Sequence, residues 1–144
     1  MELFYFEWNW QFPMYLNLTY IKLILKDKHP EKWKWLLEVL NRCPKLQNLT
    51  IHEDSELGCE QFNWMDPTIV PECLSTQLRT CLLKDYKNTK CEIQFAKYIL
   101  QNSKVLNTMS IKSATSLDIN VKHQMITKLT SSRRASTTCE LFFY

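Results

Sequence analysis

The sequence predicts an α/β fold made of repeated units, each with a β-strand followed by an α-helix. Two observations predict it: apolar runs of strand length alternate with amphipathic helical stretches, and the pattern of one half of the chain returns in the other. A βα unit that recurs and cannot bury its own apolar face is typical of a solenoid. Because strands joined through helices run parallel with right-handed crossovers, we expect a right-handed solenoid fragment with a terminal helix and strand.

A strand, a helix and a second strand are predicted in the first half of the chain. The first strand is the β-branched, apolar run at 18–25. Pro30 suits the first helical position, and Pro44 ends the helix, because the residue before a proline is pushed out of the helical region. The helix carries one apolar stripe, formed by Trp33, Leu36, Leu37 and Leu40. The second strand lies at 46–51, and the aromatic-rich residues 1–14 predict either a strand fragment or an irregular terminus.

The same order of elements returns after a polar region at 53–63 and a proline-containing segment at 64–74. The predicted elements are a strand, a helix and a strand, at 78–83, 92–102 and 105–111. Asn88 lies in the turn between the first strand and the helix, where asparagine suits a left-handed backbone conformation. The second half therefore predicts a further strand–helix–strand group.

A helix and a strand are predicted to close the chain. The helix covers about 117–129, with Ser116 or Asp118 as its capping residue. In the last residues Cys139, Leu141 and Phe143 alternate with Thr138, Glu140 and Phe142, as expected of a strand.

The repetition can be measured as an offset in residue number. Val39-Leu40 corresponds to Ile99-Leu100 at an offset of 60, and at that offset Leu46 and Ile51 meet Leu106 and Ile111. A local match of residues 25–27 to residues 83–85 gives an offset of 58 instead. In this alignment the segment 64–74 is an insertion between consecutive units. The alternative is chance similarity between two generic amphipathic segments.

Composition favours a soluble, intracellular protein, cytoplasmic or nuclear. The 144 residues are 45% hydrophobic and 23% charged, which is typical of one globular domain or a domain with part of its neighbour. A dispersed net charge of +3 argues against nucleic acid, and no apolar run has the length of a membrane span. The six cysteines lack the density of a disulfide scaffold, so we expect reduced thiols.

The residues predict no enzyme. One glycine does not allow a phosphate-binding loop, and the histidines and cysteines lack metal-ligand spacing. His52-Glu53-Asp54 predicts a polar turn, and the scattered cysteines give no preferred nucleophile. We therefore expect no catalytic residue, no metal site and no cofactor, and the sequence leaves partner-binding residues unassigned.

Several residues allow a binding interpretation beside a structural one. Arg133-Arg134-Ala135-Ser136 resembles a basophilic kinase site, but a structural loop is favoured; phosphate on Ser136 would pair locally with the two arginines. Trp33 is predicted in the core, and Trp64 is favoured as a plug into its own domain over an interface anchor. Trp8 and Trp10 are the better candidates for an exposed surface.

One set of spaced motifs resembles a known domain. The set consists of Trp64-x-x-Pro67-x-x-Val70-Pro71-x-Cys73-Leu74, Tyr86, residues 95–102, Val105-Leu106-x-x-Met109-x-Ile111 and Arg134-Ala135-Ser136-x-x-Cys139-x-Leu141-x-Phe143. In this order they are similar to the FBD domain of plant F-box/FBD/LRR-repeat proteins. Residues 12–23 and 43–49 resemble the leucine-rich repeats that precede that domain, and Asn88 departs from its usual glycine.

The resemblance implies two segments, a partial leucine-rich-repeat segment at 1–63 and an FBD domain at 64–144. It also implies a leucine-rich-repeat-like fold and a non-catalytic module for substrate recognition by an SCF-type ubiquitin ligase. The sequence shows no F-box, so it resembles a truncated receptor, and binding to the Skp adaptor is not expected. The alternative is a stand-alone regulatory remnant that competes for partners or associates with itself.

Overall fold

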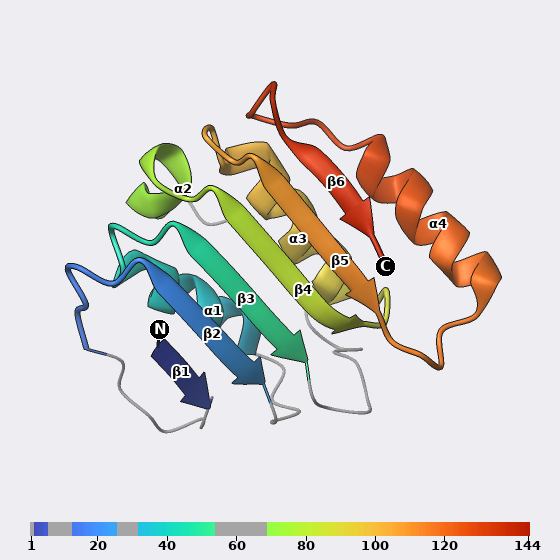
Figure 1. The fold of residues 1–144 in the computed structure, drawn as a ribbon, viewed down its shortest axis with the longest axis horizontal. Helices are drawn as coiled ribbons and strands as arrows, with labels where there is room; N and C mark the ends of the chain where they lie inside the picture. Colours follow the sequence, from blue (N-terminus) through green and yellow to red (C-terminus); the bar gives the residue numbers. More distant parts are fainter. Residues whose placement is uncertain (1, 6–12, 26–31, 54–68) are drawn as a thin grey trace.

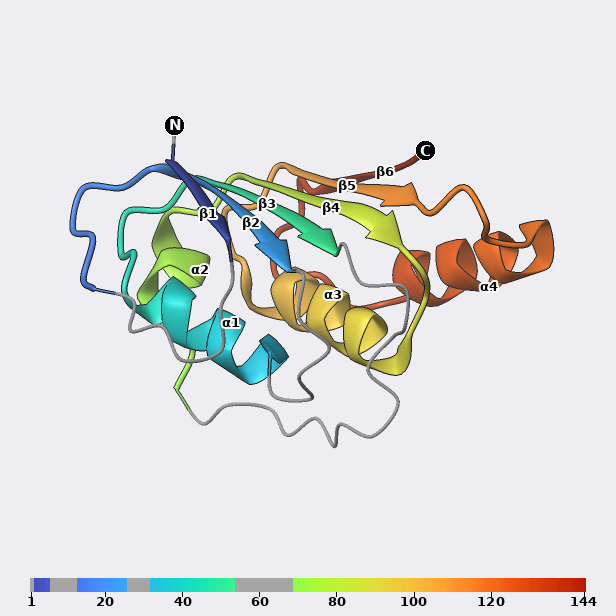
Figure 2. The ribbon, with the colours of Figure 1, turned by 90° about the horizontal axis from the view of Figure 1, so that it is seen from below.

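Residues 2–5, 13–25, 32–53 and 69–144 are described by the structure, a computed structural model. Within them, six parallel strands form one sheet in chain order (Figure 1): β1 (Glu2–Tyr5), β2 (Tyr20–Leu25), β3 (Asn48–Glu53), β4 (Thr80–Tyr86), β5 (Thr108–Ser113) and β6 (Glu140–Phe143). The helices are α1 (Lys32–Asn41), α2 (Glu72–Thr76), α3 (Lys90–Asn102) and α4 (Ile119–Thr130). They all lie on one side of the sheet (Figure 2). The predicted α/β alternation of parallel strands and helices is confirmed.

The strand registers explain the repeat seen in the sequence. Ile21 pairs with Leu49, 28 residues later, and Leu49 pairs with Cys81, 32 residues later. The next two pairs repeat offsets of 28 and 32, so each alternate strand recurs at the expected interval of 60. The local offset of 58 is wrong, because Leu23 rather than Leu25 shares the row of Leu83 through their common neighbour on β3. A shift of two residues keeps every side chain on its face, so apolar pattern alone does not reveal it.

The segment at 64–74 does not separate two independent units. Strands β3 and β4 are direct neighbours, so this stretch belongs to the crossover that joins them. The offset of 32 residues between β3 and β4 returns between β5 and β6, so the stretch adds no residues to the repeat and the prediction of an insertion is wrong. The last residues of the stretch form the start of α2, which packs between α1 and α3. Cys73 and Leu74 are fully buried there, and the Cys73 thiol donates to the Leu40 carbonyl at 3.6 Å. Trp64 and Pro67 lie outside the described residues.

The core lies between the sheet and the helices. Alternate strand residues point into it, and one register row contains four buried aliphatic side chains: Leu23, Ile51, Leu83 and Ile111. Each such side chain contributes about 1.5–3 kcal/mol when fully buried. Trp33 is buried as predicted. Trp8 and Trp10 lie outside the described residues.

Local sequence signals explain where the later helices begin. Thr89 and Glu92 form a reciprocal capping box, so α3 begins two residues earlier than predicted. Asp118, one of the two expected caps, accepts a hydrogen bond from the Asn120 backbone nitrogen at the start of α4. At the other end of the sheet, β1 shows that part of residues 1–14 is a strand paired with β2.

Candidate functional site

Among the described residues, no helix lies on the other face of the sheet, and this open face is the candidate site (Figure 2). Its side chains alternate with the buried ones and form three rows across the strands. The first row consists of Tyr20, Asn48, Thr80, Thr108 and Glu140. The second consists of Lys22, Thr50, Leu82, Ser110 and Phe142. The third consists of Ile24, His52, Lys84 and Lys112.

The open face mixes apolar, polar and cationic groups. Phe142 is 39% exposed, and Leu82 on the same row is half-buried. Lys84 and Lys112 stand directly opposite each other on neighbouring strands, and neither forms an ion pair with a described residue. Like charges directly opposite each other in a sheet are destabilising, so these ammonium groups favour an anionic partner.

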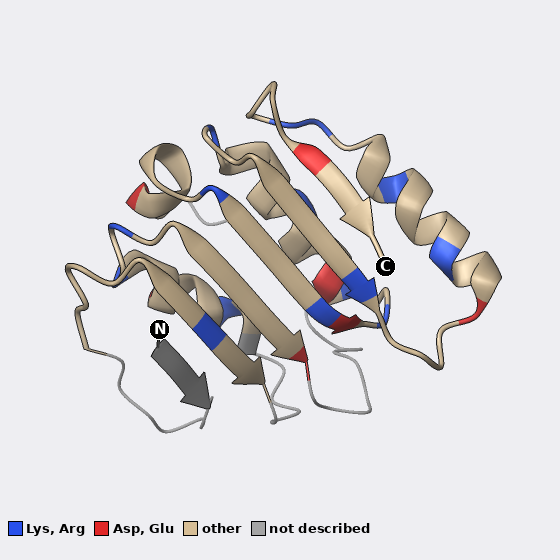
Figure 3. Cartoon of the chain, in the orientation of Figure 1, with Lys and Arg blue, Asp and Glu red and all other residues tan. Residues whose placement is uncertain are grey.

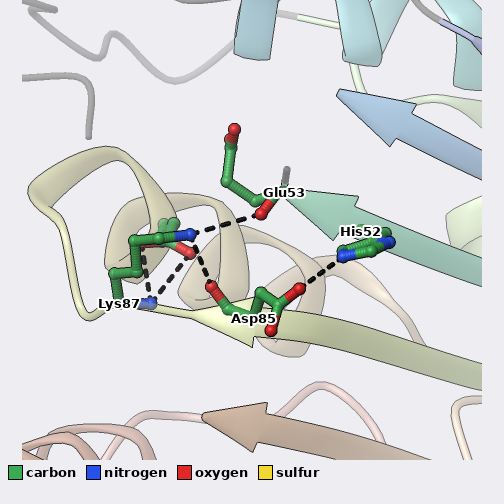
Figure 4. A network of polar contacts seen from close by, with 5 residues as sticks. His52, Glu53, Asp85 and Lys87 are labelled. Carbon is green, nitrogen blue, oxygen red and sulfur yellow. Dashed lines mark hydrogen bonds and ion pairs between the residues drawn. The ribbon is translucent and has the colours of Figure 1, made fainter. Parts of the chain in front are cut away.

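A network of polar contacts joins the carboxyl ends of β3 and β4 (Figure 4). The register shifts at Asp85, whose backbone has a positive φ of 55°. The Asp85 carboxylate contacts the His52 ring nitrogen Nε2. The Lys87 ammonium donates to the carbonyl oxygens of Glu53 and Asp85 at 3.2 and 3.0 Å. A bulge of this kind re-aims a side chain, and here it fixes an acid and a histidine beside the open face.

A buried carboxylate fixes the turn that follows. Glu92 is 3% exposed and accepts hydrogen bonds from the Lys87 and Thr89 backbone nitrogens, at 3.2 and 3.1 Å, and from the Thr89 hydroxyl at 2.8 Å. Burial raises the pKa of Glu92, and these hydrogen bonds oppose the shift only in part. Asn88 has the predicted left-handed conformation, with φ of 61°. This carboxylate therefore stabilises the turn and does not face the open side as a reactive group.

The described cysteines are buried in the core as thiols, outside any disulfide. Burial raises the pKa of Cys43 to about 11 and the pKa values of Cys73 and Cys81 to about 12. Such thiols stay protonated near neutral pH, whereas a nucleophilic cysteine needs a lowered pKa. Cys59 lies outside the described residues. Among the described histidines, cysteines and acids, no group of three has a metal-binding arrangement.

The loop at 133–136 is held by the fold. The Ala135 backbone nitrogen donates to the Leu100 carbonyl at 2.9 Å, and an Arg134 guanidinium nitrogen donates to the Cys139 carbonyl at 3.0 Å. Ser136 is only 3% exposed. These contacts support the structural interpretation, and they argue against a phosphate that pairs locally without disturbing the fold.

The sequence left the partner-binding residues unassigned, yet it contained a signal for the open face. In β2 and β5 and along most of β4, alternate residues are buried, so the remaining residues lie on the opposite face. On β3 the open-face residue Thr50 is buried as well. What the sequence did not show is how the strands align, which brings Lys84 beside Lys112. None of the helices in the described ranges has the length and apolar character that a membrane crossing requires.

Comparisons with known proteins match one domain family. The FBD family model matches residues 66–111. An F-box/FBD/LRR-repeat protein of Arabidopsis thaliana is 34% identical over 88% of this chain, and a second such protein is 33% identical over 90%. An FBD-associated F-box protein of the same plant is 36% identical over 75% of this chain.

These matches cover 28%, 30% and 26% of the relatives' own lengths, so the chain spans less than a third of the curated relatives it matches. No solved structure matches the chain.

Proposed function

Since the chain carries an FBD domain of the plant F-box/FBD/LRR-repeat protein family, we propose that it is a non-catalytic protein-interaction module. Its role would be substrate recognition for an SCF-type ubiquitin ligase. The observation that carries the proposal is the open face, which combines the exposed Phe142 side chain with half-buried apolar groups and the cations Lys84 and Lys112. Aromatic side chains are enriched in protein interfaces, and charged groups lie mainly at the polar rim.

The proposal includes a finer account of the architecture. The regular register offsets support a leucine-rich-repeat-like solenoid, for which right-handed crossovers are expected. Within it we propose a repeat segment at 1–63 and an FBD domain at 64–144. The two segments would share one sheet, because β3 and β4 pair directly. In such an arrangement the open face continues across both segments, so both contribute to target binding.

We place the module inside the cell, in the cytoplasm or nucleus, where free thiols persist. The proposal needs no cofactor. Binding to the Skp adaptor would require an F-box, a segment that the 144 residues do not resemble.

An F-box graft tests the proposal. The chain would be expressed in plant cells with and without an F-box fused to its amino terminus, and captured proteins would be examined for ubiquitylation. We expect one or more specific proteins to be ubiquitylated only with the graft.

The open face is tested by a matched pair of variants in the grafted protein. The face variant combines Lys84→Glu, Lys112→Glu and Phe142→Ser. The control changes exposed helix residues in the same way and combines Lys34→Glu, Lys128→Glu and Ile126→Ser. Ubiquitylation should be lost in the face variant and kept in the control. Self-association of the chain, with no graft-dependent ubiquitylation, would instead support a regulatory remnant.

A further inference from the structure

Basic side chains gather in the loops that precede β3, β4, β5 and β6 (Figure 3). These loops, residues 42–47, 77–79, 103–107 and 131–139, contain no aspartate or glutamate. They carry Arg42, Lys45, Arg79, Lys104, Arg133 and Arg134, of which all but Arg134 are exposed. We call this set the basic edge. Five exposed cations without an acid in the same loops are a marked local excess for a chain with a net charge of +3.

Backbone hydrogen bonds hold these loops side by side. The backbone nitrogens of Gln47, Arg79 and Asn107 each donate to the equivalent carbonyl of the preceding loop, all at 2.8 Å, and Glu140 continues the series at 2.9 Å. The loops therefore stand at strand spacing, and together with the loop before β2 the five loops span roughly 19 Å, since neighbouring strands lie about 4.8 Å apart. The basic edge is thus a fixed row.

Apolar side chains extend the row at one end. Met14 and Leu16, in the loop before β2, are 54% and 60% exposed. This loop is joined to the next one, because the Tyr15 backbone nitrogen donates to the Arg42 carbonyl at 2.8 Å and Lys45 Nζ lies 3.5 Å from Asn17 Oδ1. Contact with solvent alone does not explain why exposed apolar side chains lie next to these cations.

Among the described residues, the opposite edge of the sheet has no such charge excess. There the carboxyl ends of the strands and the loops after them carry Glu53, Asp85 and Asp118 together with Lys84, Lys87 and Lys112. Counted in the same way, the basic edge gains one acid, Glu140 at the start of β6, against its six cations. The excess at the basic edge therefore does not reflect the net charge of the whole chain. It distinguishes one end of the strands from the other.

We propose that the basic edge, with Met14 and Leu16, binds an acidic protein segment that carries apolar side chains at one end. The inference rests on the proposed function, in that the partner is a protein. A helix of roughly 13 residues covers about 19 Å, so a short acidic helix matches the length of the row. Its carboxylates would lie along the four basic loops, and its apolar side chains would contact the loop before β2.

A labelled peptide provides the probe. A fluorescein-labelled peptide of about 15 residues, rich in glutamate and with leucines at one end, covers roughly 22 Å as a helix. A second peptide has glutamine in place of every glutamate. Fluorescence anisotropy with the 144-residue chain would be measured at about 0.15 M salt, where the Debye length of about 8 Å suppresses long-range effects of net charge.

Two triple variants change net charge equally. The edge variant combines Lys45→Glu, Arg79→Glu and Lys104→Glu. The control combines Lys34→Glu, Lys90→Glu and Lys128→Glu, at exposed positions on helices. We expect the edge variant and the glutamine peptide to bind at least about tenfold more weakly, equivalent to about 1.4 kcal/mol, and the control to keep its affinity. Circular dichroism should show both variants folded.

A second pair of variants tests the apolar end of the row, formed by Met14 and Leu16. Met14→Ser with Leu16→Ser should weaken binding of the glutamate peptide, whereas Ile119→Ser with Ile126→Ser, on exposed positions of α4, should not. Equal losses in the two pairs would exclude a specific contribution of the loop before β2.

Three results would overturn the inference: no binding of the glutamate peptide, equal losses in the two triple variants, or edge-dependent binding only to anionic lipid vesicles or single-stranded DNA.

The F-box graft distinguishes failure of this inference from failure of the proposed function. If the edge variant keeps graft-dependent ubiquitylation while the face variant loses it, the inference fails and the proposed function stands. If no graft-dependent ubiquitylation occurs but the peptide binds at the edge, the proposed function fails alone.

Discussion

Trp33 and Phe95 pack with ring centroids 5.1 Å apart and planes inclined by 39°, although they belong to different helices and lie 62 residues apart in the sequence. Trp33 comes from α1 and Phe95 from α3, and both are almost fully buried. The contact joins the two halves of the chain on the helical side of the sheet. The halves therefore share one core.

Truncation of either ring should destabilise the whole chain. We expect Phe95→Ala to lower the free energy of unfolding by about 3–5 kcal/mol, as aromatic truncations in cores do. A double-mutant cycle with Trp33→Ala should give a coupling energy of about 0.5–1.5 kcal/mol. Urea denaturation measures both, with Ile126→Ala on exposed α4 as the control, expected within about 0.5 kcal/mol of wild type. A Phe95→Ala effect as small as the control would mean that the halves do not share a core.

Asn88 should tolerate glycine better than a β-branched residue. Its φ of 61° lies in the left-handed region, where most side chains cost roughly 1–2 kcal/mol and glycine costs little. We expect Asn88→Val to lose about that amount and Asn88→Gly to stay within about 1 kcal/mol of wild type, by chemical denaturation. Asn107→Val, at an exposed position with negative φ, serves as the control. Equal losses for valine and glycine would exclude backbone strain as the cause.

The buried Glu92 carboxyl should make stability depend on pH. Because burial raises its pKa in the folded state above the value in the unfolded state, the protonated form is favoured by folding. Its contribution to stability is therefore fully present below the unfolded pKa and is lost as the pH rises through the folded pKa. Glu92→Gln cannot ionise and keeps an oxygen that accepts hydrogen bonds.

The stability of Glu92→Gln relative to wild type should consequently increase from pH 4 to pH 7. Urea unfolding of both proteins at several pH values measures the difference in their free energies of unfolding. Groups that titrate alike in the two proteins cancel from this difference. Glu38→Gln, at an exposed position on α1, should show no such trend. A relative stability that falls with pH would reverse the assigned direction of the pKa shift.

Ser136 should not accept a charge without loss of stability. Its hydroxyl group is buried in the loop that Ala135 and Arg134 anchor to the rest of the fold. We expect Ser136→Asp to lower the free energy of unfolding by about 1–3 kcal/mol, because a charged group loses its hydration. Thr137→Asp, next to it and exposed, should change little. A basophilic kinase should phosphorylate a peptide covering 130–140 but not the folded chain; efficient phosphorylation of the folded chain would contradict the burial of Ser136.

The sheet shows which features the sequence predicted and which only the tertiary structure decided. Alternation of apolar and polar residues predicted which side chains of β2, β4 and β5 face the core, because successive strand residues point to opposite faces. Alternation did not decide between offsets of 58 and 60, because both place Leu83 in the core. Only the hydrogen-bonded pairing between strands selects one register.

By itself, the sequence determined the order of most strands and helices, the left-handed turn at Asn88, the Asp118 cap and the burial of Trp33, because short-range patterns encode these features. It did not determine that β3 and β4 are neighbours or that α2 belongs to their crossover. Nor did it place Lys84 beside Lys112, or align the basic loops into one row. These features depend on contacts between residues far apart in the chain, which only the assembled sheet brings to a strand spacing of about 4.8 Å.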